Sequence, residues 1–342
     1  MGNLHQVLRT LHIAFIKSKR NRIIMKSLSN YVTNGVYENA ITFDYIKKRG
    51  VDSQLTVSTF SSYHSIPKIA KHLILLINKF VAYRIKGLSK DKVYNGSEII
   101  ISSSLSEYKI FDFHHKSVLT LYSSIDKMMQ VERNKQIFSI AYKTPSTYSV
   151  CRDRSFVVEE MIPHEAVNVE NAFAYLCENM NVFIKKQRER SNIYEIDFKS
   201  SWFHFKNKFG DSCMLEEGTI TIMCFTHGDL WSSNIIYDGS NYYVTDFEHA
   251  DKRYFLYDFF FFIFTEWHLN KNPLLVDNYF GGNYDRYLYA IFDQVGYSYN
   301  PNKRQKYFLI FLVFIMSGRW LEYDAINPLI ENFLKLYISS YK

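Results

Sequence analysis

The sequence lacks the features of a disulfide-stabilised or membrane-spanning protein. Its four cysteines are widely separated, with no pair at the short spacing of a metal or redox motif, so the pattern predicts reduced thiols. The longest uninterrupted apolar run, from Tyr307 to Met316, has ten residues, about half of what a membrane-crossing helix needs. The apolar patch from Leu11 to Ile16 is too short for a signal peptide and runs straight into basic residues. We therefore expect a cytoplasmic protein.

Acidic residues are absent before Glu38, a stretch that carries six basic residues: Arg9, Lys17, Lys19, Arg20, Arg22 and Lys26. The net charge of the whole chain, +7, is too diffuse to indicate a nucleic-acid partner. Two interpretations of the basic segment remain open. It can be a solvated helix packed on the next domain, or it can lie against an anionic membrane surface or an acidic partner.

Hydrophobic patterning divides the 342 residues into three parts. Residues 1–95 form a basic, mostly helical N-terminal extension, with amphipathic stretches at Leu4–Tyr31 and Pro67–Ile85. Residues 96–162 form a small antiparallel sheet with one helix, and residues 163–342 form a larger, mostly helical lobe. The resulting fold class is α+β, with the two lobes preceded by the extension.

The elements expected in the second and third parts are short and well separated. The strands are Glu98–Ile101, Tyr108–Phe111, Ser117–Tyr122 and Phe156–Val158, with a helix at Ile125–Ile140. After Pro163 the expected helices are Val167–Arg190, Tyr254–Leu269, Tyr284–Val295 and Arg304–Tyr323, interrupted by a β-rich stretch at Thr219–Phe247.

One segment carries a recognisable chemistry. It contains His227-Gly228-Asp229, then Asn234, then Asp246-Phe247-Glu248. The apolar run ending at Phe225 can be a strand that delivers a loop, and the residues on either side of Asp238-Gly239 can pair as a hairpin. That hairpin would bring Asp246 back beside Asn234. Two carboxylates and a carboxamide would then meet at one point, which suits the positioning and charge neutralisation that phosphoryl transfer requires.

The order His-x-Asp-x-x-x-x-Asn followed by Asp-Phe-Glu resembles the catalytic and metal loops of aminoglycoside phosphotransferases and choline kinases. Protein kinases carry a related pattern. The resemblance implies a two-lobed, protein-kinase-like fold and an ATP- and Mg²⁺-dependent kinase. It makes Asp229 the catalytic base, and Asn234 and Asp246 the ligands of the magnesium that bridges the ATP phosphates. It places Asp258 on the following helix, tying down the catalytic loop.

The resemblance extends more weakly into residues 96–162 and implies a nucleotide site there. Glu160, Met161 and Ile162 would form the hinge whose backbone pairs with adenine. Glu132 would be the helix acid that faces the cleft, or one charge on a solvated face. The turn with Ser103 and Ser104 replaces a glycine-rich phosphate loop, and its hydroxyl and N–H groups can cradle phosphate.

One departure from the family pattern concerns the phosphate-binding lysine. The third strand of the lobe should carry it, but Thr120 occupies that position. Lys109 on the preceding strand is the first substitute, with Lys116 and Lys127 behind it. Because the lysine is missing, a catalytically degenerate nucleotide- or partner-binding protein is the alternative to a kinase.

The acceptor is expected to be a small molecule or a glycan, most simply a saccharide. Aromatic residues of the helical lobe can stack on sugar rings, although core packing explains most of them better. Protein phosphorylation is a weaker alternative, because the His-Gly-Asp and Asp-Phe-Glu triplets are more typical of small-molecule kinases.

Overall fold

The computed structural model describes residues 2–39, 44–51, 81–85, 93–102, 107–197, 205, 207, 209, 220–317 and 326–338. Contacts divide the chain into two compact units. Unit 1 comprises residues 1–131 and 145–163, and unit 2 comprises residues 132–144 and 164–342. None of the helices in the described ranges has the length and apolar character of a membrane span.

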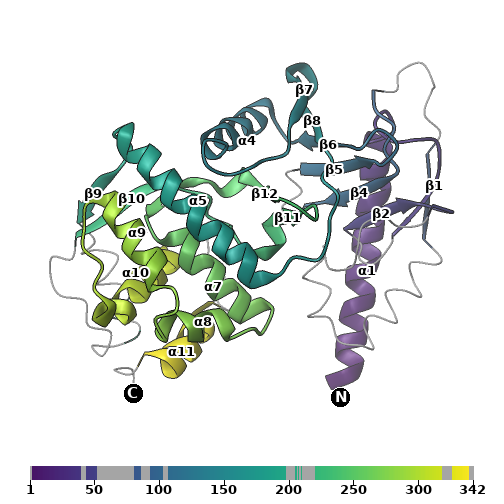
Figure 1. The fold of residues 1–342 in the computed structure, drawn as a ribbon. Coiled ribbons are helices and arrows are strands. Elements are labelled where there is room, and N and C mark those ends of the chain that lie inside the picture. The colour runs from purple at the N-terminus through teal and green to yellow at the C-terminus, as the bar shows by residue number, and fades with distance from the viewer. Residues whose placement is uncertain are drawn as a thin grey trace. The chain divides into compact units, whose positions relative to one another are not determined.

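Unit 1 is built on an eight-stranded sheet in the order β3-β1-β2-β4-β5-β6-β8-β7, in which every pairing is antiparallel (Figure 1). The strands are β1 (Gly35–Asn39), β2 (Tyr45–Lys48), β3 (Ala82–Ile85), β4 (Glu98–Ile101), β5 (Glu107–Asp112), β6 (Ser117–Tyr122), β7 (Thr147–Cys151) and β8 (Phe156–Glu160). Helix α4 (Ile125–Phe138) connects β6 to β7 in the chain. The predicted α+β class and the predicted strands of this sheet are confirmed.

The N-terminal extension differs in part from its prediction. Helix α1 (Gly2–Ser27) confirms the helical beginning, but the same segment also supplies β1, β2 and β3, which the sequence did not predict. A helix was expected at Pro67–Ile85, but its last four residues form strand β3. Residues 67–80 lie outside the described ranges. The apolar pattern of so short a strand cannot be told from one turn of a helix, because the periodicity needs a longer window.

Helix α1 packs against one face of the sheet. Its residues Ile24 and Met25, and Leu28 directly after its end, are buried in one cluster with sheet residues that include Ile110 and Leu119. Polar contacts fix the helix further, because Lys17 and Arg20 both bond to the Asp44 carboxylate, at 2.6 and 2.7 Å. Hydrophobic packing and two ion pairs therefore anchor α1 on this face of the sheet.

Unit 2 combines helices with two small β-structures. The helices are α5 (Val169–Glu189), α7 (Tyr257–Leu269), α8 (Leu274–Phe280), α9 (Asp285–Val295), α10 (Arg304–Ser317) and α11 (Ile326–Tyr337). The strands are β9 (Tyr194–Asp197), β10 (Ile220–Thr226) and β13 (Asp251–Tyr254), in the order β13-β10-β9, and the hairpin of β11 (Ile235–Tyr237) and β12 (Tyr242–Val244). The predicted helices α5, α7, α9 and α10 are confirmed, apart from the residues expected after Ser317, which lie outside the described ranges.

The centre of unit 2 is aromatic. Every residue of α7 from Tyr257 to Glu266 is buried, and the ring of Phe260 lies 4.8 Å from that of Phe308 and 5.1 Å from that of Tyr279. Fully burying an aromatic side chain contributes roughly 1.5–3 kcal/mol. The phenylalanines of α7 therefore serve the core and are not available to stack on an acceptor.

Replacement of Phe260 by alanine should lower the free energy of unfolding by about 3–5 kcal/mol, because the cavity left among packed rings cannot collapse fully. Urea denaturation followed by circular dichroism measures the loss. Tyr148→Ala is the control, since this side chain is 58% exposed and its removal should change the unfolding midpoint little. Equal effects of the two substitutions would contradict the assignment of α7 to the core.

Candidate active site

The predicted loop and hairpin are present in unit 2. Strand β10 delivers residues 227–231, a 3₁₀ turn at Ser232–Asn234 follows, and β11 and β12 pair in the register Ile235↔Val244. The turn at Asp238-Gly239 is closed by the Asp238 carboxylate, which accepts the N–H groups of Ser240 and Asn241. The local turn chemistry of the sequence was therefore sufficient to predict this hairpin.

The hairpin brings the end of β12 back to Asn234. The N–H of Thr245 donates to the Asn234 carbonyl at 3.0 Å, and the next residue is Asp246. The Asn234 side chain in turn donates from Nδ2 to the main-chain oxygen of Asp229 at 2.7 Å and to its carboxylate at 3.3 Å. Asn234 is thus bonded to Asp229, and Asp246 follows the residue that bonds the Asn234 carbonyl. Since Nδ2 faces Asp229, Asn234 Oδ1 is the amide atom suited to bind a cation.

Asp246 has a left-handed backbone, with φ 67° and ψ 63°. Aspartate and asparagine tolerate this conformation better than other residues with a Cβ atom. The residue lies directly before the 3₁₀ turn Phe247–His249, so its backbone conformation helps to turn the chain away from β12. Asparagine can replace Asp246 without changing this geometry, which separates the role of the charge from that of the backbone.

Asp258 fixes the backbone of the loop from the first turn of α7. Its two carboxylate oxygens accept the N–H groups of His227 and Gly228, at 2.7 and 2.8 Å. Burial raises the pKa of this carboxyl, while His227 and the two N–H bonds act in the opposite direction. Asp238, in the turn between β11 and β12, shows the contrast, because its bonds from Asn241 and Ser240 lower its pKa. Asp258 therefore has the positioning geometry that the resemblance implied.

Gly228 is required by the same close packing. Its φ is +80°, and a Cβ atom there would lie 2.4 Å from Arg253 Nη1 and 2.5 Å from the His249 carbonyl oxygen. Arg253 also donates to Thr226 Oγ1 at 3.2 Å. Any side chain at residue 228 would have to displace the backbone just before Asp229.

His227 connects the two loops. Its Nε2 lies 3.0 Å from the carbonyl oxygen of Thr245, and because a carbonyl can only accept, Nε2 carries the proton. The imidazole packs edge-on against Phe138 and beside Phe247, with ring centroids 5.6 and 5.2 Å apart. His227, two residues before Asp229, thus bonds Thr245, the residue directly before Asp246.

Several supporting residues were not predicted from the sequence. Asn134 donates to the Phe247 carbonyl at 3.0 Å, and Gln187 of α5 bonds both the N–H and the C=O of Phe225. The fully buried Glu266 accepts the Ser232 N–H at 3.3 Å and the Asn270 side chain at 2.7 Å. Glu266 alone had a signal in the sequence, as a second acid on the otherwise apolar helix that carries Asp258.

Of the predicted nucleotide-binding residues, Lys109 lies in unit 1 on β5, directly opposite Thr120 of β6. Their neighbours Ile110 and Leu119 point into the cluster beneath α1. Because side chains alternate along a strand, Lys109 and Thr120 share the face opposite α1. The Lys109 ammonium lies 3.5 Å from the Glu107 carboxylate. Lys109 therefore places a positive charge on the same face of the sheet as Thr120, one strand away from the position where the family pattern expects a lysine.

The predicted hinge is partly occupied by the sheet. The Glu160 N–H donates to the Ser146 carbonyl at 2.8 Å, and the Met161 N–H donates to the Lys116 carbonyl at 3.0 Å. Within the described residues the Ile162 N–H has no such acceptor, so it is the donor in this stretch that an adenine can use. Glu132 is 8% exposed and belongs to unit 2, while Ser103 and Ser104 lie outside the described ranges.

Comparisons with known proteins give structural similarities only. No protein-family model and no curated protein sequence matches this chain. A choline/ethanolamine kinase family protein from Mesorhizobium loti is 10% identical, with a TM-score of 0.39, over 74% of this chain and 90% of that one. The choline kinase LicA from Streptococcus pneumoniae is 11% identical, with a TM-score of 0.37, over 68% and 89%.

A thermostable mutant of the aminoglycoside phosphotransferase APH(4)-Ia is 13% identical, with a TM-score of 0.43, over 72% of this chain and 96% of that one. The three proteins bear the names of the family that the sequence motif resembles. At TM-scores of 0.37 to 0.43, the function of this chain has to follow from its own residues.

Asp258→Ala should lower the free energy of unfolding by about 1–4 kcal/mol, because two buried N–H groups lose their acceptor while the burial of a charge is relieved. Asp238→Ala is the matched control. It also removes a carboxylate that accepts two backbone N–H groups, but water can replace it at an exposed turn. Chemical denaturation measures the free energy of unfolding of both variants. An equal loss in the two would show that burial does not make the bonds of Asp258 more stabilising than those of Asp238.

Proposed function

We propose that this protein is an ATP- and Mg²⁺-dependent kinase that phosphorylates a hydroxyl group of a small molecule or a glycan. The observation that carries the proposal is that Asn234 is bonded both to Asp229 and to the residue directly before Asp246. Phosphoryl transfer needs a group that orients the acceptor hydroxyl and ligands for the metal that neutralises phosphate charge, and a carboxylate base with a second carboxylate and a carboxamide can supply both.

The donor set fits magnesium, which prefers carboxylate and amide oxygens and retains several waters. Asp246 and Asn234 Oδ1 would hold the ion, which neutralises charge on the phosphates of ATP when both are bound. Asp229 would accept the proton of the acceptor hydroxyl as that oxygen attacks. The bonds of Asp258 and His227 hold the loops that carry these groups, so the carboxylates need little rearrangement before reaction.

The proposed nucleotide contacts come from unit 1 and α4. Lys109 would offset phosphate charge in place of the lysine missing at Thr120, with Lys116 and Lys127 as further candidates, and the Ile162 N–H would pair with adenine. Ser103, Ser104 and Glu132 complete the proposed set through the resemblance alone. Support for Lys109 comes from its register opposite Thr120 and from its place on the face opposite α1.

A saccharide is our first choice of acceptor, within the broader class of small molecules and glycans. This choice rests on the aromatic content of the helical lobe and on the basic N-terminal segment, but the aromatic run of α7 gives it no support, since those rings are buried in the core. Transfer of phosphate from radiolabelled ATP to a panel of sugars, aminoglycosides and amino alcohols tests both the reaction and the class.

A catalytically degenerate, nucleotide-binding protein is the second candidate. Thr120, which is only 1% exposed, favours it, because this position then offers no cation for the phosphates. Magnesium-dependent consumption of ATP with any acceptor of the panel would exclude this candidate. Binding of ATP without turnover across the panel would favour it.

Asp229→Ala should leave ATP binding nearly unchanged and reduce phosphoryl transfer by roughly 10²–10⁴-fold, the usual contribution of a positioned base. Isothermal titration with ATP and steady-state turnover measure the two effects. Glu189→Ala, a change of an exposed carboxylate on α5, is the control. Wild-type turnover of the Asp229 variant would remove this residue from the mechanism.

Asp246→Asn should abolish turnover and raise the magnesium concentration needed for nucleotide binding, because a neutral amide holds a divalent cation less tightly than a carboxylate does. Lys109→Ala should mainly raise the KM for ATP, and Lys185→Ala, at an exposed position on α5, should change neither quantity. A magnesium titration of all three variants separates the effects. Unaltered magnesium dependence of Asp246→Asn would place the metal elsewhere.

A further inference from the structure

Helix α1 has two faces of different character. Its inner face is buried on the sheet through Asn21, Ile24 and Met25. Its outer face consists of exposed side chains at helical spacing: Phe15, Ile16, Lys19, Arg22, Ile23 and Lys26. Since α1 is already anchored by its inner face, the composition of the outer face needs a separate explanation.

The basic residues of α1 whose side chains the structure describes fall into two groups. Lys17 and Arg20 lie at the side of the helix and are neutralised by Asp44. Lys19, Arg22 and Lys26 are exposed on the outer face, and no ion pair joins them to another described residue. Their spacing of three and four residues aligns them along one stripe. The outer face therefore presents three positive charges in a row.

Large apolar side chains lie among these charges. Phe15 is 71% exposed, Ile16 is 52% exposed and Ile23 is 66% exposed. Single exposed apolar residues are common on protein surfaces. Three of them beside three cations on one helix face are typical of helices that lie in the interface of a membrane, where apolar side chains enter the acyl boundary and cations contact the headgroups.

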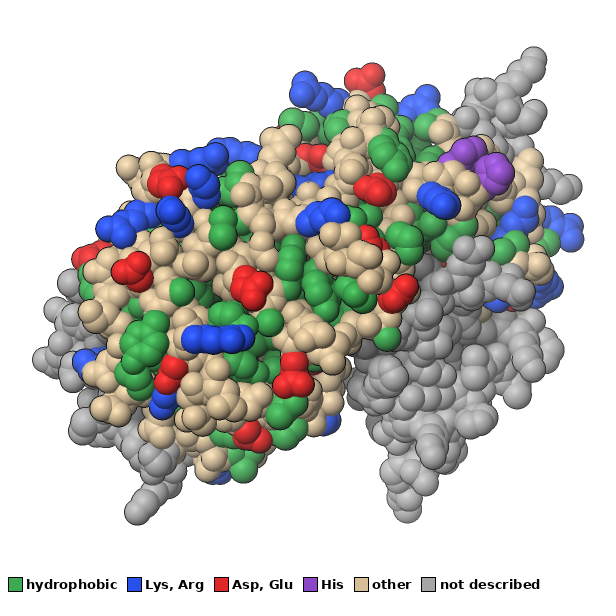
Figure 2. All heavy atoms as spheres, in the orientation of Figure 1, with side chains coloured by type: hydrophobic (Ala, Val, Ile, Leu, Met, Phe, Trp, Pro, Cys, Tyr) green, Lys and Arg blue, Asp and Glu red, His purple; other side chains and the backbone are tan. Residues whose placement is uncertain are grey.

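We infer that the outer face of α1 docks on an anionic phospholipid bilayer. Charge complementarity selects the partner, because negative lipid headgroups attract basic residues at a membrane surface. The apolar residues favour a bilayer over a nucleic acid, whose phosphates would be served by the cations alone. On the face of the molecule shown in Figure 2, by contrast, Lys and Arg side chains are interspersed with acidic ones.

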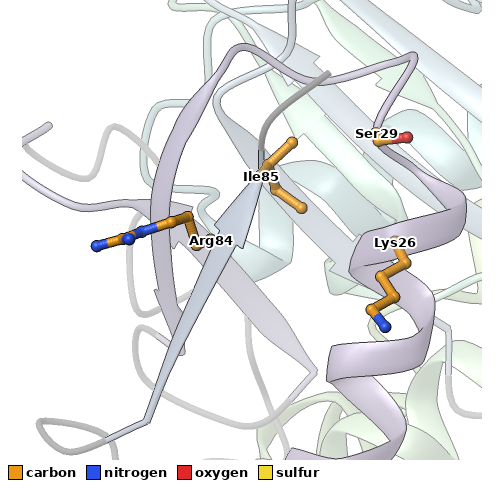
Figure 3. Close-up of a pocket in the computed structure, with 4 residues that line it drawn as sticks. All are labelled: Lys26, Ser29, Arg84 and Ile85. Carbon is orange, nitrogen blue, oxygen red and sulfur yellow. The ribbon is translucent and has the colours of Figure 1, made fainter. Parts of the chain in front are cut away.

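A pocket beside the outer face agrees with a broad surface rather than a closed ligand site. It has a volume of about 460 Å³ and is lined by Lys26, Ser29, Arg84 and Ile85. In Figure 3 the charged ends of Lys26 and Arg84 extend in different directions. They therefore do not converge on one small anion, but they widen the positive surface from α1 to strand β3.

The test is co-sedimentation of the full-length protein with lipid vesicles. We expect binding to vesicles of phosphatidylcholine and phosphatidylglycerol, weak binding to phosphatidylcholine alone, and a loss of binding at high salt. The triple variant Lys19→Glu, Arg22→Glu, Lys26→Glu should have a vesicle affinity at least about a hundredfold lower than that of the wild type. Each basic residue near an anionic surface raises the affinity roughly fivefold. Phe15→Ser with Ile23→Ser should also weaken binding while the charge stays the same.

A matched triple variant, Lys185→Glu, Arg190→Glu, Lys303→Glu, changes the net charge equally at exposed positions of unit 2 and should bind like the wild type. Circular dichroism melting confirms that each variant is folded. Binding by the α1 triple variant equal to that of the wild type would overturn the inference. The inference would also be overturned if the Phe15→Ser, Ile23→Ser variant bound vesicles like the wild type and polyaspartate displaced both proteins from the vesicles equally well. That result would indicate an acidic polymer as the partner. Because Asp229→Ala should still bind vesicles, failure here is distinguishable from failure of the kinase proposal.

Discussion

The buried carboxylate of Asp258 is the group on which the candidate active site depends. It accepts the two N–H groups that precede Asp229 and so sets the direction in which the loop leaves β10. Backbone N–H groups suit this role because they carry partial positive charge and do not titrate, and the charges of His227 and Arg253 also lower the pKa of the carboxyl. The burial that raises its pKa also shields the two bonds from competing water.

Core packing and site geometry are coupled through α7. The helix is held by aromatic rings along most of its length, and it carries Asp258 in its first turn and Glu266 near its end. These carboxylates bond the loop on either side of Asp229, at Gly228 and at Ser232. A loop joined at two points to a rigid helix has few conformations to lose when a substrate binds, which is the physical advantage of preorganisation.

Local signals in the sequence were sufficient for the parts of the site that are local in the chain. The turn at Asp238-Gly239 and the short strands around it followed from residue type and alternation, and strands β4 and β6 have their predicted bounds. Contacts across long separations were not predictable in this way. Asn134 bonds Phe247 from a distance of 113 positions in the chain, and nothing in the periodicity of α4 selects that partner. Likewise, the three strands β1, β2 and β3 join the sheet through tertiary contacts, which the local sequence does not reveal.

The register of the sheet gives the missing lysine a physical interpretation. Lys109 and Thr120 are cross-strand neighbours, and such pairs have Cβ atoms about 4.5–5.5 Å apart. A lysine stem with four rotatable carbons can span that displacement, so its ammonium can occupy nearly the same space from β5 as from β6. Glu107 lies 3.5 Å from this ammonium and pairs with it. In the proposed kinase, a threonine buried at 120 would then cost little, because Lys109 would supply the charge from the neighbouring strand on the same face of the sheet.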